Sequence, residues 1–234
     1  MDEHLNGSRL LAISGLRNLR DLGGLGAVRT GLCYRSAGLG LLTAEGAREL
    51  AKLGLRTVID LRDPLELVQH PDRTHDLEVD LANFPLLPQD GPEDPHGLPL
   101  DRVYPLIIDT QGPALVAVLR RLLEPEALPA LLHCAIGRDR TGIVTALLLD
   151  LLGVPEEQII ADYMLSNEGL DLLDGPREYV DVHGVTRLSH PVEARLLTDL
   201  LALVREQHGG TEAYLRTHGL NSAEILDLRA TLRE

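Results

Sequence analysis

The segment HCAIGRDRTG, residues 133–142, constrains the fold of this chain more than any other stretch of its sequence. It lies between a short apolar run at residues 128–132 and a long apolar run at residues 143–152. Short runs of this kind are typical of buried strands, and long runs are typical of buried helices. The pattern therefore predicts a strand, a loop and a helix in succession, with the chemistry of the protein in the loop.

The loop has the properties of an anion-binding site. A helix that begins near Arg140 offers unpaired backbone N–H groups and the positive end of its dipole to whatever the loop encloses. A thiol in this field loses its proton near neutral pH, whereas free cysteine has a pKa of about 8.5. Cys134 is therefore the candidate nucleophile. The planar guanidinium of Arg140 can hold two oxygens of a phosphate, a geometry that lysine cannot match.

Other loop residues are expected to support this chemistry. Gly137 allows the backbone to turn inward. The hydroxyl of Thr141 is positioned to donate a hydrogen bond to the Cys134 sulfur, and His133 is expected to orient the loop through its ring nitrogens. The phosphate is expected to be bound by the six residues that follow the cysteine: Ala135, Ile136, Gly137, Arg138, Asp139 and Arg140.

These residues resemble the signature of the cysteine-dependent tyrosine phosphatase superfamily, and more narrowly that of bacterial atypical phosphatases with the loop pattern HCxxGKDRTG. The narrower group usually has lysine where this chain has Arg138, which keeps the charge but changes its shape and reach. Four further segments resemble the same group: NLRDLGG at 18–24, YRSAGL at 34–39, TVIDLR at 57–62 and ADYMLSN at 161–167. The resemblance therefore covers most of the chain.

The resemblance implies an α/β fold like that of the tyrosine phosphatases, with a central, mainly parallel sheet, helices on both faces and extra helices at the C-terminus. It implies hydrolysis of phosphate monoesters, above all phosphotyrosine in proteins, through a phosphocysteine on Cys134. Dual-specificity and phosphoinositide phosphatases use the same mechanism and remain alternatives. In the resembling group the loop aspartate acts as general acid, a role that falls to Asp139 here. Asp60 and the acidic residues of 89–94 are rival candidates.

Composition restricts the partners of the protein. The 234-residue chain has a formal net charge of −14, which argues against nucleic-acid binding because that requires a basic face. No apolar run is long enough to span a bilayer. Two cysteines cannot make a disulfide framework, and the N-terminus does not resemble a signal peptide. We expect a bacterial, cytoplasmic enzyme without a cofactor, and the histidine spacing indicates no metal site.

The remaining patterns predict one phosphatase domain over residues 1–234, of which about 192–234 form a C-terminal helical segment. Strands are predicted at 56–63 and 77–86, and residues 10–36 have the pattern of short strands and turns. Helices are predicted at 42–54, 101–109, 112–124, 141–152, 156–169, 192–208, 211–217 and 221–232. Residues 87–99 are expected to form a loop, either a rim of the site or a solvated surface. Residues 174–191 are expected to be irregular and able to cover the site.

Three residues outside the loop have structural roles as their simplest interpretation. Arg20 and Asp21 are expected to form a mutual ion pair that braces the loop, in preference to contacting the substrate. Cys33 is expected to be a small buried hydrophobe. The alternative for Cys33 is a resolving thiol for an oxidised Cys134.

Two other classes of function are alternatives to the phosphatase. An inactive phosphate-binding module is disfavoured because Cys134, Arg140 and Thr141 are all present. A redox or sulfur-transfer enzyme would need a loop without the Arg140 clamp, or a resolving cysteine, for which only Cys33 is available.

Overall fold

The computed structural model describes residues 9–88 and 94–234. Within these ranges a five-stranded sheet forms the centre of the molecule, in the order β1-β2-β5-β3-β4. Its strands are β1 (Arg20–Asp21), β2 (Cys33–Ser36), β5 (Ala130–His133), β3 (Thr57–Asp60) and β4 (Asp80–Asn83). β1 is antiparallel to β2, and the other neighbouring pairs are parallel. The prediction of a central, mainly parallel sheet is confirmed.

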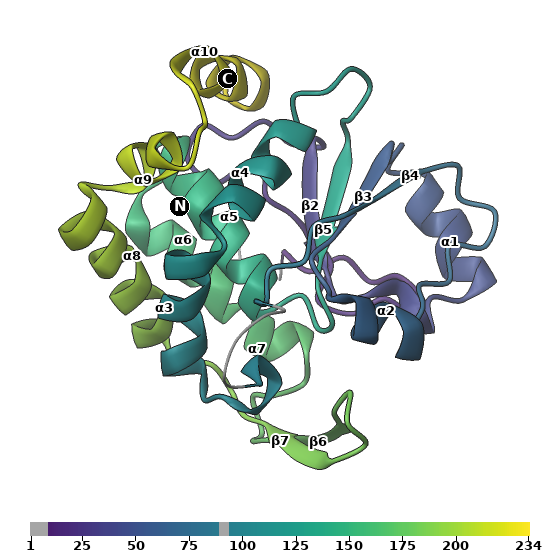
Figure 1. Ribbon diagram of the computed structural model, residues 1–234. Helices are drawn as coiled ribbons and strands as arrows, with labels where there is room; N and C mark the ends of the chain where they lie inside the picture. Colours follow the sequence, from purple (N-terminus) through teal and green to yellow (C-terminus); the bar gives the residue numbers. More distant parts are fainter. Residues whose placement is uncertain (1–8, 89–93) are drawn as a thin grey trace, which may run out of the picture.

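Helices cover both faces of the sheet (Figure 1). One face carries α1 (Ala44–Ala51) and α2 (Pro64–Gln69). The other face carries α3 (Leu100–Thr110), α4 (Gly112–Arg121), α5 (Asp139–Leu151), α6 (Glu156–Met164), α8 (Ala194–His208), α9 (Thr211–Thr217) and α10 (Ser222–Leu232). Shorter turns of helix are η1 (Leu39–Leu41), η2 (Pro95–Gly97) and α7 (Ser166–Gly169). No helix of the described ranges is both long enough and apolar enough to cross a membrane.

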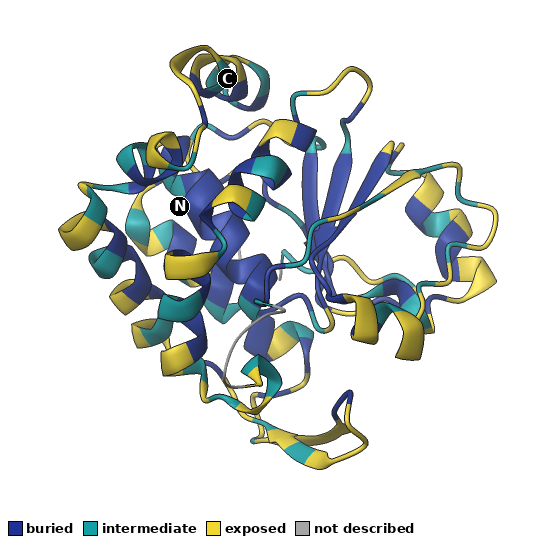
Figure 2. Ribbon diagram, in the orientation of Figure 1, coloured by how far each residue is buried: buried dark blue, intermediate teal, exposed yellow. Residues whose placement is uncertain are grey.

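The side chains of β5 alternate between two hydrophobic cores. Ala130 and Leu132 belong to the large core beneath the long helices, whereas Leu131 belongs to a smaller core beneath α1. Because successive side chains of a strand point to opposite faces, a strand between two cores must be apolar throughout. Helix α5 is buried along nearly its whole length (Figure 2). These burials explain both apolar runs that flank the loop in the sequence.

Most predicted helices are present with small differences at their ends. Helix α9 has the predicted bounds, and Thr43 caps α1 by accepting a hydrogen bond from the backbone N–H of Gly46, as its sequence indicated. The helix predicted at 156–169 is instead two helices, α6 and α7, which are separated at Leu165. The predicted strand at 77–86 is shorter, and only Asp80–Asn83 pairs with β3.

Helix α2 was not predicted, although its start has a clear signal. Asp63 accepts hydrogen bonds from the backbone N–H groups of Leu65 and Glu66, and Glu66 accepts one from the N–H of Asp63. This reciprocal arrangement is a capping box, and Pro64 occupies the first helical position, where its missing N–H costs nothing. The predicted strand at 56–63 therefore ends at Asp60.

Residues 174–191 were predicted to be irregular, and this is wrong. They contain an antiparallel hairpin of β6 (Arg177–Val180) and β7 (Thr186–Ser189), which projects from the body of the molecule below α7 (Figure 1). Asp181 shapes the turn because its side chain accepts hydrogen bonds from the N–H groups of His183 and Val185.

Candidate active site

The loop joins two central elements. β5 ends at His133 and α5 begins at Asp139, so the loop lies at the carboxyl ends of the parallel strands, where ligands bind in open α/β sheets. Gly137 has a φ of +65°, and a Cβ at this position would stand 1.8 Å from the carbonyl oxygen of Ser36. Only glycine fits this turn.

Side chains from two other segments hold the carbonyl groups of the loop. The side-chain amide of Asn18 donates to the carbonyls of Ile136 and Gly137, at 3.3 and 3.0 Å. The guanidinium of Arg35 donates to the carbonyls of Gly137 and Arg138, at 3.0 and 3.3 Å. These contacts bind the carbonyls of Ile136, Gly137 and Arg138, and a loop that leads into a helix N-terminus favours an anion.

A buried ionic cluster supports both of these donors. Asp162 of α6 is paired with Arg20 at 3.0 Å and with Arg35 at 2.8 Å. Burial raises the pKa of Asp162, but the two guanidinium groups outweigh burial and hold that pKa below its usual value. Arg20 also donates to the side-chain oxygen of Asn18 at 2.6 Å. The predicted ion pair between Arg20 and Asp21 is therefore wrong, because neighbouring residues of a strand point to opposite faces.

The surroundings of Cys134 favour its thiolate. Burial raises the pKa of this thiol, but the Arg140 guanidinium and hydrogen bonds from the side chain and the backbone of Thr141 outweigh burial. The pKa therefore lies below the usual value. The Thr141 hydroxyl is buried and has no hydrogen-bond partner of ordinary geometry in the part of the chain that the structure describes, so it is free to turn toward the sulfur. The structure thus brings together three residues that were assigned to one reaction.

Arg140 is held by Glu66, a residue that the sequence analysis missed. Its two terminal nitrogens, Nη1 and Nη2, lie 2.5 and 2.6 Å from the two carboxylate oxygens of Glu66, and both residues are buried. Burial opposes the charge of Arg140, but Glu66 and Cys134 raise its pKa above the usual value. The capping box that begins at Asp63 was the available signal, because it would have placed Glu66 just beyond the end of a central strand.

Asp139, the candidate acid, has two neighbours of different kinds. Nε of Arg138 lies 3.2 and 3.1 Å from its two oxygens, and the hydroxyl of Tyr104 donates to Oδ1 at 2.9 Å. Nη1 of Arg138 donates to the Ser189 hydroxyl at 3.0 Å and to the carbonyl of His190 at 2.8 Å. The end of the β6–β7 hairpin is thereby bound to the loop. That residues 174–191 cover the site stays a prediction.

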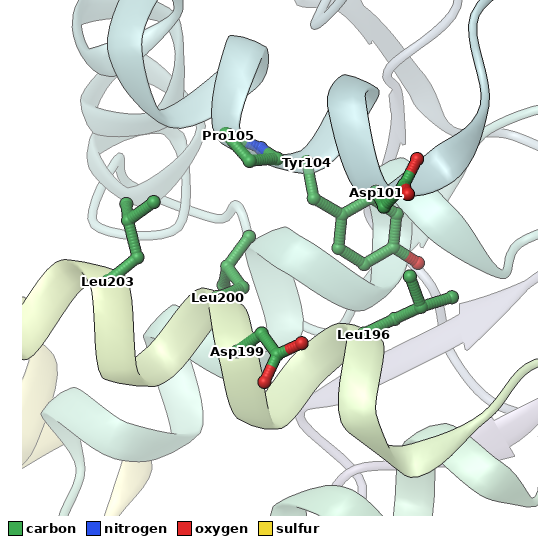
Figure 3. Close-up of a pocket in the computed structure, with 7 residues that line it drawn as sticks. All are labelled: Asp101, Tyr104, Pro105, Leu196, Asp199, Leu200 and Leu203. Carbon is green, nitrogen blue, oxygen red and sulfur yellow. The ribbon is translucent and has the colours of Figure 1, made fainter.

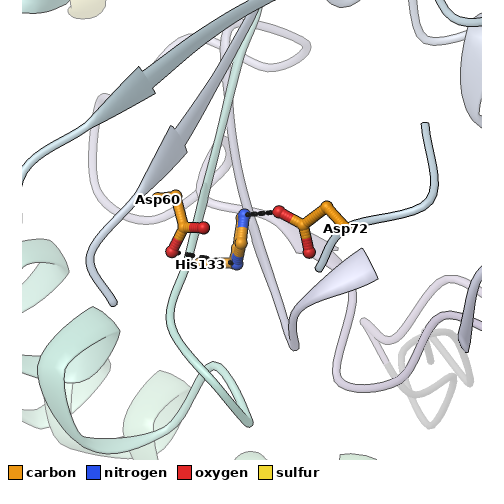
Figure 4. A group of neighbouring side chains, drawn as sticks. All are labelled: Asp60, Asp72 and His133. Carbon is orange, nitrogen blue, oxygen red and sulfur yellow. Dashed lines mark ion pairs between the residues drawn. The ribbon is translucent and has the colours of Figure 1, made fainter. Parts of the chain in front are cut away.

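His133 lies between the carboxylates of Asp60 and Asp72 (Figure 4). Its Nδ1 is 3.8 Å from Asp60 and its Nε2 is 3.2 Å from Asp72, while Arg62 pairs with both carboxylates at 2.6 and 2.9 Å. Burial lowers the pKa of His133, but Asp72 and Asp60 outweigh burial and raise that pKa above its usual value. The cluster fixes the ring of His133, the residue from which the loop departs.

The rival acids have other partners. Both carboxylate oxygens of Asp60 accept hydrogen bonds from Arg62, at 2.6 to 3.0 Å. Asp90 and Glu93 lie outside the described residues. Asp94, the described acid of the same segment, is paired with His183 of the hairpin turn at 2.9 Å. Among the described candidates, Asp139 is therefore the acid that belongs to the loop and is not held by Arg62 or by the hairpin turn.

Cys33 is remote from Cys134. It lies in β2 in register with Ala130, at the opposite end of β5 from the loop. At a rise of about 3.3 Å per residue, the two cysteines are about 13 Å apart along the strands, which is beyond disulfide reach. Burial, with a contribution from Asp21, raises the pKa of Cys33 to about 12. The alternative of a resolving thiol is not supported, and Cys33 is a buried hydrophobe.

Two groups of described side chains have the composition of a cation site. They are Asp60, Asp72 and His133, and Asp63, Glu66 and His96. Each group already contacts a buried guanidinium, Arg62 in the first and Arg140 in the second. Their carboxylate charge is therefore balanced by arginine, and the expectation of metal-independent chemistry stays a prediction.

Comparisons with known proteins give the family of the chain. The chain matches the Tyrosine phosphatase family over residues 11–234. It is 31% identical over 220 residues to a tyrosine-protein phosphatase of Nostoc commune, covering 85% of this chain and 73% of the relative. It is 29% identical over 269 residues to the triple specificity protein phosphatase PtpB of Mycobacterium tuberculosis, covering 94% of this chain and 98% of the relative.

A solved structure with a related outline is the core catalytic domain of the PP-IP phosphatase SIW14 from S. cerevisiae. It has 18% sequence identity and a TM-score of 0.41, over 66% of this chain and 78% of that chain. The family match extends over nearly all of the described residues. The matched range includes the loop, the three residues that support it (Asn18, Arg35 and Asp162) and Glu66. The protein belongs to the tyrosine phosphatase family.

Proposed function

We propose that this protein hydrolyses phosphate monoesters, above all phosphotyrosine in proteins, through a phosphocysteine intermediate on Cys134. One observation carries the proposal: a buried thiol with a lowered pKa shares one loop with the Arg140 guanidinium and the Thr141 hydroxyl. Neither a phosphate-binding module nor a redox enzyme requires all three groups together. The second cysteine that a redox reaction would use lies at the far end of the sheet.

The first step is an in-line displacement at phosphorus. A bond forms between the Cys134 sulfur and phosphorus while the bond between phosphorus and the ester oxygen breaks, and the electron pair of that bond stays on the oxygen. Arg140 and the loop N–H groups stabilise the equatorial oxygens. Asp139 gives its proton to the departing oxygen, so the alcohol or phenol leaves neutral.

The second step regenerates the thiolate. Asp139 is now ionised and takes a proton from a water molecule as that water attacks the phosphocysteine. The sulfur–phosphorus bond breaks, its electron pair returns to Cys134, and inorganic phosphate is released. The Thr141 hydroxyl favours the thiolate, which assists sulfur as the leaving group in this step.

The substrate range is the open part of the proposal. The names of the two relatives support phosphotyrosine first, and one of them supports additional classes of ester. Phosphoserine, phosphothreonine and phosphoinositides are therefore included as alternatives. A panel of matched phosphopeptides and phosphoinositides, assayed with and without EDTA, distinguishes these classes by their kcat/KM values.

The mechanism is tested by a rapid-quench assay with a small aryl phosphate and the full chain. We expect a burst of phenol, and a phosphoenzyme that is absent in Cys134→Ser, a variant that still binds phosphate esters because the loop N–H groups remain. A binding module would show neither burst nor turnover, and a redox enzyme would turn over only with a thiol co-reactant. Wild-type activity in Cys134→Ser would overturn the proposal.

We further propose that residues 1–234 act as one phosphatase domain in a reducing cytoplasm. Leu200, Tyr214 and Leu228 of the C-terminal helices are part of the same core as α5, which supports a single cooperative unit. A free thiolate at Cys134 is the active form, and reducing conditions preserve it.

A further inference from the structure

Tyr104 connects the candidate acid to the helical side of the molecule. Its hydroxyl lies 2.9 Å from Oδ1 of Asp139 and 2.7 Å from the hydroxyl of Tyr163. Tyr104 belongs to α3 and Tyr163 to α6, and the side chains of both are almost completely buried. Asp139 at the start of α5 is thus joined by hydrogen bonds to two other helices.

The ring of Tyr104 is buried, and its hydroxyl is held by two hydrogen bonds. It lines one side of a cavity of about 80 Å³ between α3 and α8, beside Leu196 and Leu200, and no residue of the reactive loop lines that cavity (Figure 3). Only 1% of Tyr104 is exposed. A side chain that is held by packing presents its hydroxyl at a fixed point, and this property is required of a group that positions a reactive neighbour.

We propose that Tyr104 is a positioning residue that holds the carboxyl group of Asp139 in the orientation needed to protonate the leaving oxygen. The proposal rests on the proposed function, because it assigns Tyr104 a part in the same displacement. Tyr104 itself touches neither phosphorus nor the leaving group. It acts through Asp139, whose other side-chain contact, Arg138, is also bound to the hairpin.

The pair of tyrosines serves Asp139 in both of its protonation states. When Asp139 is ionised, Tyr104 donates to it. When Asp139 carries its proton on Oδ2, Oδ1 keeps its lone pairs and still accepts from Tyr104, while Tyr163 donates to Tyr104. The contact with Asp139 therefore persists before and after proton transfer, and no buried hydroxyl loses its partner.

The charged and titratable groups around Asp139 set the background for this contact. They are Arg138 and Cys134 of the loop, Tyr104 of α3 and Tyr163 of α6. Burial raises the pKa of Tyr104 well above its usual value, and burial likewise raises that of Tyr163. Both hydroxyls therefore stay protonated across the working pH range, and they act as hydrogen-bond partners rather than as acids.

The test compares Tyr104→Phe with Tyr214→Phe, a matched control. Tyr214 of α9 is also buried. Its hydroxyl donates to the carbonyl of Ile108 in α3, the helix of Tyr104, at 2.7 Å, and does not contact Asp139. For Tyr104→Phe we expect kcat on phenyl phosphate to fall by about 10- to 100-fold, with a much smaller loss on a phosphate of an acidic phenol. Tyr214→Phe is expected to slow both substrates equally and only slightly.

A double-variant cycle decides whether Tyr104 acts through Asp139. If it does, Tyr104→Phe combined with Asp139→Asn should be no slower on phenyl phosphate than Asp139→Asn alone, because the group that Tyr104 positions has already been removed. Losses that multiply would overturn the proposal, as would equal losses of Tyr104→Phe on both leaving groups. If the wild type shows no burst on the acidic-phenol substrate, the proposed function itself is contradicted. Failure of the positioning role and failure of the proposed function are therefore distinguishable.

Discussion

Glu66 and Arg140 meet through two hydrogen bonds of 2.5 and 2.6 Å, each between a different pair of atoms, which join the start of α2 to the first turn of α5. A paired geometry of this kind fixes the plane of the guanidinium as well as its position. The phosphate clamp is therefore oriented before any substrate arrives. The same carboxylate closes the capping box of α2, so one side chain links a helix cap to the reactive loop.

Glu66→Gln tests this orientation. Glutamine retains the capping interaction with the N–H of Asp63 but removes the charge and one acceptor that face Arg140. We expect kcat/KM on an aryl phosphate to fall by about 10-fold or more, with a loss of about 1–3 kcal/mol in the free energy of unfolding. Arg140→Lys keeps the charge but loses the planar guanidinium that can hold two phosphate oxygens, so its kcat/KM should fall further. Steady-state kinetics and urea unfolding measure both effects, and an unimpaired Glu66→Gln would mean that Arg140 is oriented by other groups.

The lowered pKa of Cys134 predicts a pH dependence of its alkylation. A thiol with a lowered pKa is ionised at a lower pH, so inactivation by iodoacetamide should reach half its maximal rate below pH of about 8.5, the value for a free thiol. Thr141→Val removes one hydrogen bond that favours the thiolate and should move the midpoint to higher pH. Cys33→Ala is the control, and its profile should match that of the wild type. An unchanged midpoint in Thr141→Val would exclude the hydroxyl as a partner of the sulfur.

Arginine, rather than a metal ion, is expected to balance the buried carboxylates. Hydrolysis should therefore continue in EDTA and be inhibited by vanadate and by peroxide, which reacts with thiolates. The measurement is the initial rate of aryl phosphate hydrolysis after extensive dialysis against EDTA. Activity that disappears on dialysis and returns with a divalent cation would indicate a metal site in one of the two carboxylate and histidine groups.

The contacts of Arg138 predict the behaviour of the β6–β7 hairpin. Arg138→Met removes the hydrogen bonds to Ser189 and His190, so the hairpin should open more often. We expect cleavage by trypsin within residues 174–191 to be about 10-fold faster or more. Arg195→Met is the control, because Arg195 forms an exposed ion pair with Glu193 outside the hairpin. A time course followed by mass spectrometry measures both, and equal rates would show that Arg138 does not hold the hairpin.

The elements around the loop could be predicted from the sequence because their signals are local. The apolar runs at 128–132 and 143–152 reflect burial on all sides, and Thr43 lies next to the helix that it caps. Partners across the fold leave no such signal. Arg20 is bound by Asp162, which is 142 residues away in the chain, and its adjacent acid Asp21 points to the other face of the strand.

The same limit explains why Glu66 and Tyr104 were missed. Tyr104 belonged to a predicted helix and Glu66 to a segment without a predicted element, but only the folded chain brings Glu66 to Arg140 and Tyr104 to Asp139. The hairpin was missed for another reason. Its strands are short and exposed, and Gly175, Pro176 and Gly184 resemble the punctuation of an irregular loop.

The assignment of Asp139 as general acid is tested by its dependence on the leaving group. Arg138 contacts both oxygens of this carboxylate, and Tyr104 donates to one of them. A general acid matters most where the departing oxygen is a poor leaving group.

Asp139→Asn should slow an alkyl or phenyl phosphate by about 100-fold or more, since the departing oxygen needs a proton, and general acid catalysis contributes effects of this size. A phosphate with an acidic phenol should be slowed much less, because its oxygen leaves readily as an anion. The measurement is kcat/KM across a series of aryl phosphates whose phenols differ in acidity, with the burst on the most acidic phenol as a control for the loop. Equal losses across the series would make Asp139 a cap of α5 and a brace for Arg138, and would return the search for the acid to Asp60 and to residues 89–94.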